Sequence, residues 1–149
     1  MDGAPEAGVV GPVSAHEVVT APGLAPPVGY AHAVRARPGR TVHLGGQTAL
    51  DARGAIRGST IVAQLDGAAA NVVAALRAAG GEPEHLVSMQ IFVRDVEDYR
   101  RNLADLGAVW RRHFGRHYPA MGLFGVTRLF DEEALVELMG VAVLPEEAS

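Results

Sequence analysis

The sequence contains no cysteine and no lysine, and each absence excludes a class of chemistry. Without cysteine the chain cannot form a disulfide, a thiolate nucleophile or a cysteine metal site. All 13 basic residues are arginine, which also excludes catalysis through a lysine Schiff base. The remaining amine, at Met1, lies in a Gly/Pro/Ala-rich segment and is a poor nucleophile. We therefore expect any reaction here to be noncovalent acid–base or electrostatic catalysis.

Long apolar runs and basic clusters are also missing. No run approaches the roughly 18 residues that cross a membrane, and residues 1–12 lack the basic start of a secretion signal. We therefore expect a cytoplasmic protein with no membrane partner. The formal net charge is −4 and the longest basic cluster is Arg111–Arg112, so we expect no nucleic-acid partner either.

The length of 149 residues fits one domain, because a core of this size buries roughly two-thirds of the unfolded chain's surface. Residues 1–13 are predicted to be a disordered tail, and residues 14–149 a single ordered domain that begins with a short strand at 14–20. Two β-compatible runs, 29–36 and 40–50, flank a Pro-Gly turn and predict a hairpin.

The apolar period then changes. From Thr60 to Ala79 apolar residues recur at three and four, which predicts an amphipathic helix that stops at Gly80. Residues 85–95 alternate as a half-buried strand does, and a second helix is predicted from Val96 to near Gly115. Two further runs around an acidic turn predict a closing hairpin, at 121–130 and 134–145.

The element order β-ββ-α-β-α-ββ predicts an α+β domain with one mixed sheet and two helices packed on one of its faces. Two helices in a single layer cannot cover both faces of a sheet. Because the strands carry apolar residues at both odd and even positions, we expect the second face of the sheet to be buried between the subunits of a symmetric oligomer.

Several segments together give the chain a family likeness: APPVGYAHAV, HLGGQTALD, GAIRG, the AQ…N…ALRAAG helix, VRDVEDY and YPA…VELMGVAV. In their order and spacing the chain resembles the Rid family (RidA/YjgF-like, also labelled L-PSP endoribonuclease-like) over residues 15–145. The resemblance implies a chorismate-mutase-like α+β fold, a homotrimer and small-molecule clefts between subunits. It also implies hydrolysis of enamines and imines such as 2-aminoacrylate, without a metal or an organic cofactor.

One position departs from the family pattern. The arginine that follows Pro-Ala in that pattern holds the substrate carboxylate, and here the position is Met121, followed by Gly122. A thioether carries no positive charge. Burying a carboxylate beside it would leave that charge unpaired, at a cost on the order of several kcal/mol. We therefore do not expect 2-aminoacrylate to be the substrate. The family glutamate that positions the attacking water is retained as Glu137, whereas the second glutamate of that strand is replaced by Met139.

The resemblance supplies the remaining candidate residues. Tyr30 matches a pocket tyrosine, and Trp110 stands where a smaller aromatic residue is usual. The stretch Gly45–Gln47 is interpreted as a close backbone approach to the cleft. Glu137 and Tyr30 are thus the catalytic candidates, and the substrate-binding candidates are Met121, Gly122, Gly45, Gly46, Gln47 and Trp110.

Other interpretations stay open at this point. Glu137 could be a solvent-facing or interface charge, and the chain could be a noncatalytic trimer that binds a small molecule or a partner protein. Ribonuclease activity has only a family label in its favour. His113 and His117 have the spacing of two metal ligands on a helix, but Gly115 lies between them and no third ligand is near. We expect no metal, and both histidines at a surface or interface.

Overall fold

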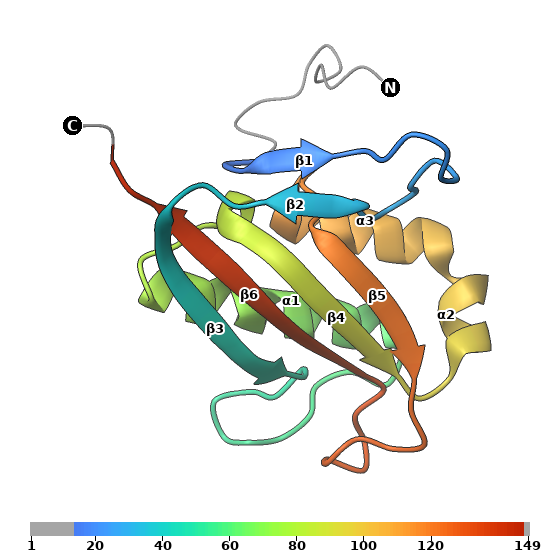
Figure 1. Cartoon of the computed structure of the whole chain (residues 1–149). Helices are drawn as coiled ribbons and strands as arrows, with labels where there is room; N and C mark the ends of the chain where they lie inside the picture. Colours follow the sequence, from blue (N-terminus) through green and yellow to red (C-terminus); the bar gives the residue numbers. More distant parts are fainter. Residues whose placement is uncertain (1–13, 148–149) are drawn as a thin grey trace.

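The computed structural model describes residues 14–147, so the predicted disordered tail at 1–13 lies outside the described residues. Figure 1 shows strands β1 (Glu17–Val19), β2 (Ala33–Arg35), β3 (Gly39–Gln47), β4 (Leu86–Val93), β5 (Ala120–Gly125) and β6 (Val136–Pro145). The helices are α1 (Ile61–Ala78), α2 (Val96–Arg101) and α3 (Leu103–Phe114), with a 3₁₀ turn at Pro83–His85. The predicted order of elements is confirmed, except that the second helix is divided in two.

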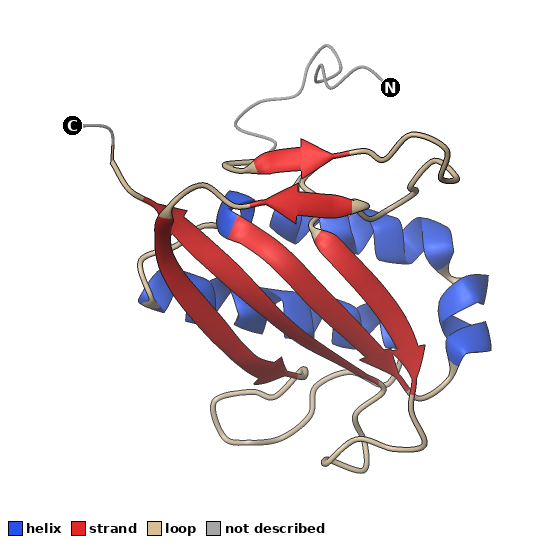
Figure 2. Ribbon diagram, viewed as in Figure 1, coloured by secondary structure: helices blue, strands red, loops and turns tan. Residues whose placement is uncertain are grey.

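The main sheet has four strands in the order β3-β6-β4-β5. Strand β6 is antiparallel to both of its neighbours, whereas β4 and β5 are parallel, so the sheet is mixed as predicted. Strands β1 and β2 form a separate antiparallel pair across one end of it. Figure 2 shows all the helices on one face of the main sheet, and no helix of the described chain lies over the other face.

Both predicted hairpins are wrong. Strand β2 pairs with β1 and not with β3, and β5 and β6 are separated by β4. The turn signals are present, but they fix only where the chain reverses and not which strand it then pairs with. Strand β6 is apolar at most positions, and the central place beside β3 and β4 buries more of that surface than pairing with the edge strand β5 would.

The core lies between the sheet and helices α1 and α3. Its fully buried side chains include Leu65 and Leu76 of α1, Met89 of β4, Leu106 of α3 and Leu138 of β6. Helix α1 starts where predicted, because the Thr60 hydroxyl accepts a hydrogen bond from the Ala63 amide at 3.1 Å. By length and composition α1 could also cross a membrane, but its apolar face is packed in this core.

The second predicted helix breaks at Asn102. The Asn102 side chain donates back to the Asp98 carbonyl at 2.8 Å, and its own backbone leaves the helical region. Helix α3 then starts at Leu103 and ends at Gly115, whose φ of +63° is in the region that favours glycine. The break turns α2 away from α3, and the Tyr99 side chain of α2 lies beside α3 on the side that faces the sheet.

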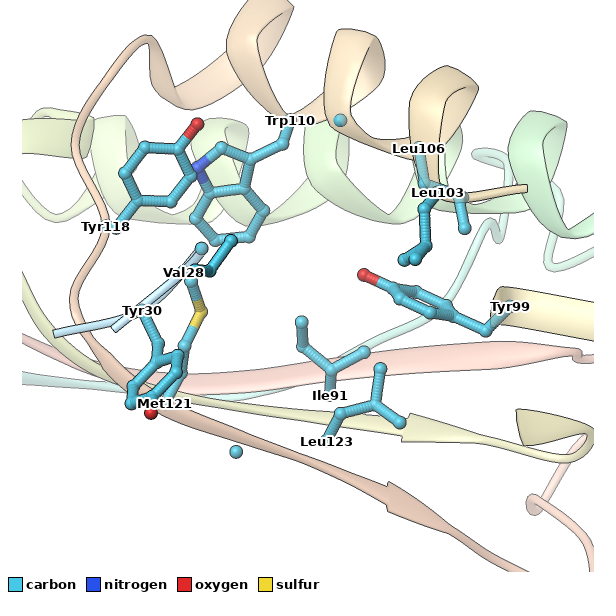
Figure 3. Close-up of a pocket in the computed structure, with 13 residues that line it drawn as sticks. Val28, Tyr30, Ile91, Tyr99, Leu103, Leu106, Trp110, Tyr118, Met121 and Leu123 are labelled. Carbon is cyan, nitrogen blue, oxygen red and sulfur yellow. The ribbon is translucent and has the colours of Figure 1, made fainter. Parts of the chain in front are cut away.

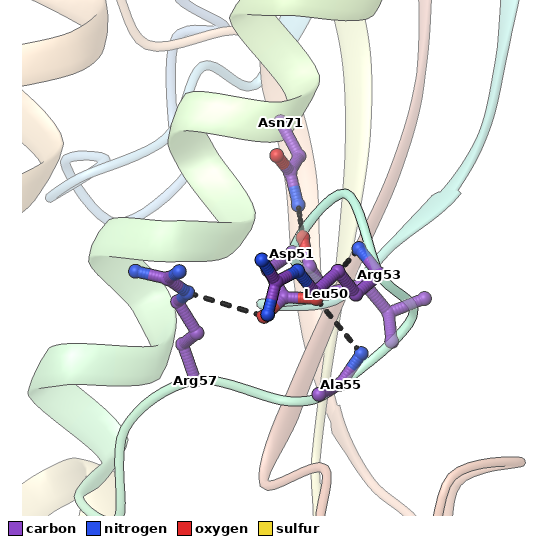
Figure 4. A network of polar contacts seen from close by, with 6 residues as sticks. All are labelled: Leu50, Asp51, Arg53, Ala55, Arg57 and Asn71. Carbon is purple, nitrogen blue, oxygen red and sulfur yellow. Dashed lines mark hydrogen bonds and ion pairs between the residues drawn. The ribbon is translucent and has the colours of Figure 1, made fainter.

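The loop between β3 and α1 is tied together by Asp51 (Figure 4). Its carboxylate accepts from the amides of Ala55 (3.0 Å) and Arg53 (2.9 Å) and pairs with Arg57 (3.3 Å). The Ala55 and Arg53 hydrogen bonds, together with Arg57, hold the pKa of the Asp51 carboxyl below its usual value. Asn71 of α1 donates to the Leu50 carbonyl (2.9 Å), so the loop and the end of β3 are fastened to the helix layer.

The sheet face opposite the helices carries exposed apolar side chains. Phe124 is 50% exposed and Met139 49%, and the Phe124 ring stacks on Phe92 with 5.8 Å between ring centroids. Polar side chains share this face, because Gln90 is paired with Met139 and Glu137 with Phe92. We call this surface, made by Phe92, Phe124, Glu137 and Met139, the open face.

Candidate functional site

A cavity of about 440 Å³ lies between helix α3 and the edge strand β5 (Figure 3). Its floor is formed by Ile91 of β4 and by Met121 and Leu123 of β5. The parallel register pairs Met89 with Met121 and Ile91 with Leu123, so these side chains all point to the helix side of the sheet. Met121 therefore lies in the cavity, where its sequence position predicted a ligand contact.

The roof of the cavity comes from α2 and α3 and includes Trp110. The indole N–H of Trp110 donates to the His117 carbonyl at 3.1 Å, and the ring lies between Phe114 and Tyr118, with centroids at 4.3 and 6.0 Å. The indole is thus fixed in place, and the surface that it presents to the cavity is carbon. Gly107, one turn earlier on α3, also lines the cavity.

The loop before β2 closes one end of the cavity with Val28 and Tyr30. The loop is held at two points: the Ala31 amide donates to the Pro119 carbonyl at 3.0 Å, and His32 bonds the Ala21 amide at 3.0 Å. Tyr30 remains 39% exposed. Its ring consequently stands at the mouth of the cavity, where it can contact both a ligand and solvent.

The lining of this cavity is uncharged. Within the described chain, every residue that lines it is aliphatic, aromatic, methionine or glycine. An apolar surrounding of this kind binds uncharged ligands, because an ionised group would lose its hydration without gaining a counter-ion. The side chains that the fold brings together therefore form an apolar cavity.

Glu137 lies elsewhere, on the open face. It is directly opposite Phe92 in the β4–β6 register and next to the irregularity between Leu44 and Gln47 of β3. A side chain at Gly46 would collide with the Glu137 carboxylate, so the glycine is what leaves room for it. Within residues 14–147 the carboxylate makes no hydrogen bond or ion pair, and it is half-buried.

The predicted site residues therefore fall on two surfaces of one chain. Tyr30, Trp110, Met121 and the backbone of Gly122 line the cavity, whereas Gly46 and its neighbour Gly45 lie beside Glu137 at the open face. Gln47 pairs with the buried Leu138 and does not line the cavity. Alternation along the strands puts Met121 and Glu137 on opposite faces of the sheet, and β4 runs between them. One copy of the chain does not bring the two groups together.

The histidine pair is not a metal site. His113 Nε2 lies 2.6 Å from the Asp66 carboxylate, and His117 Nε2 bonds the Leu86 carbonyl at 2.8 Å, so the two rings face different partners. The hydrogen bond from His113, and then Arg112, lowers the pKa of Asp66. The prediction that both histidines lie at a surface is wrong for His117, which is 2% exposed under the end of α3. Among residues 14–147 no cluster of three His, Asp or Glu side chains could hold a metal ion.

Sequence reasoning missed Tyr99 and Tyr118 as cavity residues. The sequence placed Tyr99 only within the second predicted helix, and it does lie in α2. The available signal was its hydroxyl, because a tyrosine on a buried stripe needs a partner for its polar end. Burial raises the pKa of Tyr99, so its hydroxyl keeps its proton at neutral pH.

Comparisons with known proteins place the chain among solved structures. The family model described as Endoribonuclease L-PSP matches residues 20–144. YyfB from Yersinia pestis, described as a protein of unknown function of the conserved Rid family, is 31% identical with a TM-score of 0.78, over 87% of this chain and 98% of that one. Rv2704 from Mycobacterium tuberculosis, of the YjgF/YER057c/UK114 family, is 31% identical with a TM-score of 0.59, over 78% and 88% of the two chains. RidA from an Antarctic Psychrobacter is 26% identical with a TM-score of 0.62, over 80% and 92%. No curated protein matches.

Proposed function

The chain belongs to the Rid family, also named YjgF or endoribonuclease L-PSP, and on that premise we propose that it hydrolyses a small imine or enamine that carries no carboxylate. The reaction would take place in a cleft between the subunits of a homotrimer, with Glu137 as the base for water and Tyr30 as an orienting hydroxyl. Neither a metal nor an organic cofactor takes part.

The uncharged cavity around Met121 is the observation that carries this proposal. In the family pattern the residue after Pro-Ala is a cation for a carboxylate, and here the fold directs a thioether into the cavity. A carboxylate placed there would be desolvated without a partner, at a cost of several kcal/mol as an order of magnitude. A neutral imine meets no such penalty.

The chemistry needs only water and one base. Glu137 takes a proton from water while the water oxygen bonds to the imine carbon, and passes that proton to the nitrogen as the double bond becomes single, which gives a carbinolamine. Glu137 then takes the proton of the new hydroxyl and passes it to the nitrogen as the carbon–nitrogen bond breaks, so that an amine leaves and a carbonyl compound remains. An enamine enters the same sequence after protonation at carbon.

The two surfaces described above support a site that is shared between chains. The cavity of one subunit holds the substrate, and Glu137 of the partner subunit supplies the base. An apolar open face around Glu137, with Phe124 and Met139 about half exposed, supports packing of copies through this face.

The test is carbonyl and amine release from freshly formed neutral imines, compared with 2-aminoacrylate. We expect the wild type to hydrolyse one or more neutral imines faster than water does, and to leave 2-aminoacrylate near its uncatalysed rate. Glu137→Gln should lower the neutral-imine rate by about 100-fold or more, the usual contribution of a positioned general base. Glu147→Gln, at an exposed position near the C-terminus, makes the same chemical change as a control.

Met121→Arg tests the substrate preference directly. If the hydrolytic groups are intact, this variant gains 2-aminoacrylate activity, and the gain disappears in the Met121→Arg/Glu137→Gln double variant. Rapid turnover of 2-aminoacrylate by the wild type would show that the cavity accepts a carboxylate and that the proposal is wrong. The second candidate, a noncatalytic trimer that binds a small molecule or partner, is favoured if no imine is hydrolysed and Met121→Arg gains nothing.

A further inference from the structure

We propose that the cavity binds an uncharged ligand that has an aromatic or other flat apolar ring and one hydrogen-bond acceptor. The Tyr99 hydroxyl donates a hydrogen bond to that acceptor. The inference rests on the proposed function in taking this cavity as the substrate site, and it names the substrate class: neutral imines, and their carbonyl products, that carry a ring. Tyr99 is then a specificity-determining residue.

The first step is the shape of the cavity. Its volume of about 440 Å³ is within the range of small-molecule sites and is far more than a three-carbon enamine fills. The roof is formed by carbon atoms of Trp110 and by Leu106, and the floor is the aliphatic surface of Ile91 and Leu123. A flat ring fits between such surfaces with apolar contact on both sides.

The second step is an account of the polar atoms that meet the ligand. The indole N–H of Trp110 is already bonded to the His117 carbonyl at 3.1 Å and is not available. Tyr30 stands at the exposed mouth, and Figure 3 shows the Tyr118 hydroxyl at the end of its ring farthest from Met121. Tyr99 is different, because its ring extends over Ile91 and Leu123 with the hydroxyl directed toward the Trp110 side of the cavity.

The third step is that the Tyr99 hydroxyl has no protein partner. Among residues 14–147 it makes no hydrogen bond, although it comes from a largely buried ring. This hydroxyl is not one of the fully buried side-chain atoms that lack a partner, so it is accessible from the cavity and free to bond a ligand there. The hydroxyl keeps its proton at neutral pH, because burial raises the pKa of Tyr99, and it can therefore donate to a carbonyl or imine acceptor on a ligand.

The experiment uses the full chain and two isosteric probes. Acetophenone has a ring and a carbonyl acceptor, and α-methylstyrene has the same shape with a methylene group in place of the oxygen. Ligand-observed NMR titration gives the dissociation constants. Trp110 is the only tryptophan in the chain, so its fluorescence reports whether a probe occupies this cavity.

We expect acetophenone to bind the wild type about three- to tenfold more tightly than α-methylstyrene, the effect of one net hydrogen bond. Tyr99→Phe should remove that difference by weakening acetophenone alone. Ser59→Ala deletes an exposed hydroxyl outside the cavity and should keep the preference. Benzoate, of similar size but anionic, should bind at least tenfold more weakly than acetophenone.

Three results would overturn the inference. They are the absence of acetophenone binding to the wild type, an acetophenone preference that survives Tyr99→Phe, and benzoate binding as tight as that of acetophenone. The assay does not depend on turnover, so it is separate from the test of hydrolysis. If the protein binds acetophenone through Tyr99 but hydrolyses no imine, this inference stands and the proposed function is wrong. If it hydrolyses small acyclic imines through Glu137 but does not bind acetophenone, the proposed function stands and this inference is wrong.

Discussion

At the scale of single residues, the position of the Glu137 side chain depends directly on the absence of a side chain at Gly46. A Cβ at position 46 would overlap the Glu137 carboxylate oxygen and lie only 3.0 Å from its carboxyl carbon. Real Cβ atoms do not approach that closely, so Gly46→Ala must displace the glutamate. The backbone at Gly46 does not require a glycine conformation, because its φ is not positive.

We therefore predict that Gly46→Ala lowers neutral-imine hydrolysis by at least about tenfold while the melting temperature changes little, because a base must stay within hydrogen-bond reach of its water. Steady-state kinetics of the single and double variants would measure this. If the alanine acts through Glu137, the Gly46→Ala/Glu137→Gln variant is no slower than Glu137→Gln alone. A further loss in the double variant would show that Gly46 matters for another reason.

The sequence predicted the members of the site better than their arrangement. Met121, Trp110 and Tyr30 do come together at one cavity, because the motif around Pro119 and the apolar stripe of the helix both point there. The separation of Glu137 from Met121 was not predictable from either segment. Alternation gives two faces for each strand, but which face of one strand matches that of another depends on the order of strands in the sheet.

At the scale of elements, Gln64 fastens the loop before β6 to helix α1. Its side-chain amide donates to the carbonyls of Gly58 (3.1 Å) and Glu133 (2.9 Å) and accepts from the Leu135 amide (2.7 Å), and the residue is 1% exposed. These bonds set the entry of the chain into β6 and therefore the position of Glu137. A buried amide with all its bonds made stabilises one loop conformation over others.

Gln64→Leu keeps the size of the side chain and leaves three backbone groups without partners. We predict a loss of about 1–3 kcal/mol in the free energy of unfolding, the cost of buried groups left unpaired. Urea denaturation would measure it. Gln90→Leu is the matched control, because the Gln90 amide bonds only the Ser88 hydroxyl, at 3.3 Å. Equal losses in the two variants would contradict this role for Gln64.

Local signals predicted the elements and failed on their pairing. The cap at Thr60 and the stop at Gly115 are short-range features that the sequence carries in full, and the helix limits agree with them. The hairpins were inferred from neighbouring runs, but β3 pairs with β6, which lies about a hundred residues later in the chain. Such pairing is decided by how much apolar surface each arrangement buries, and no local window contains that comparison.

At the scale of the whole molecule, the fold is two layers with one side uncovered. Helices cover one face of the sheet, and the open face leaves Phe124 and Met139 about half exposed beside Glu137. Patches of this kind on a small domain usually mark an interface. The sequence predicted that a second copy would be needed, but the number of copies depends on the angle between sheets, which no single chain fixes.

We predict that the protein in solution has three times the 15.6 kDa mass of one chain, and that Met139→Glu reduces this mass. A charge buried at the centre of the open face would be desolvated without a partner, which opposes association. Light scattering measures the mass, and Ala74→Glu on the exposed side of α1 is the matched control.

The Met139→Glu variant also tests the cavity and the open face separately. Because the cavity is formed within one chain, dissociated Met139→Glu should still bind acetophenone, whereas imine hydrolysis should fall with the loss of Glu137 of the partner subunit. A wild-type monomer would refute the trimer. Full hydrolytic activity in a dissociated variant would show that one chain suffices, and would require Glu137 to be replaced by another base near the cavity.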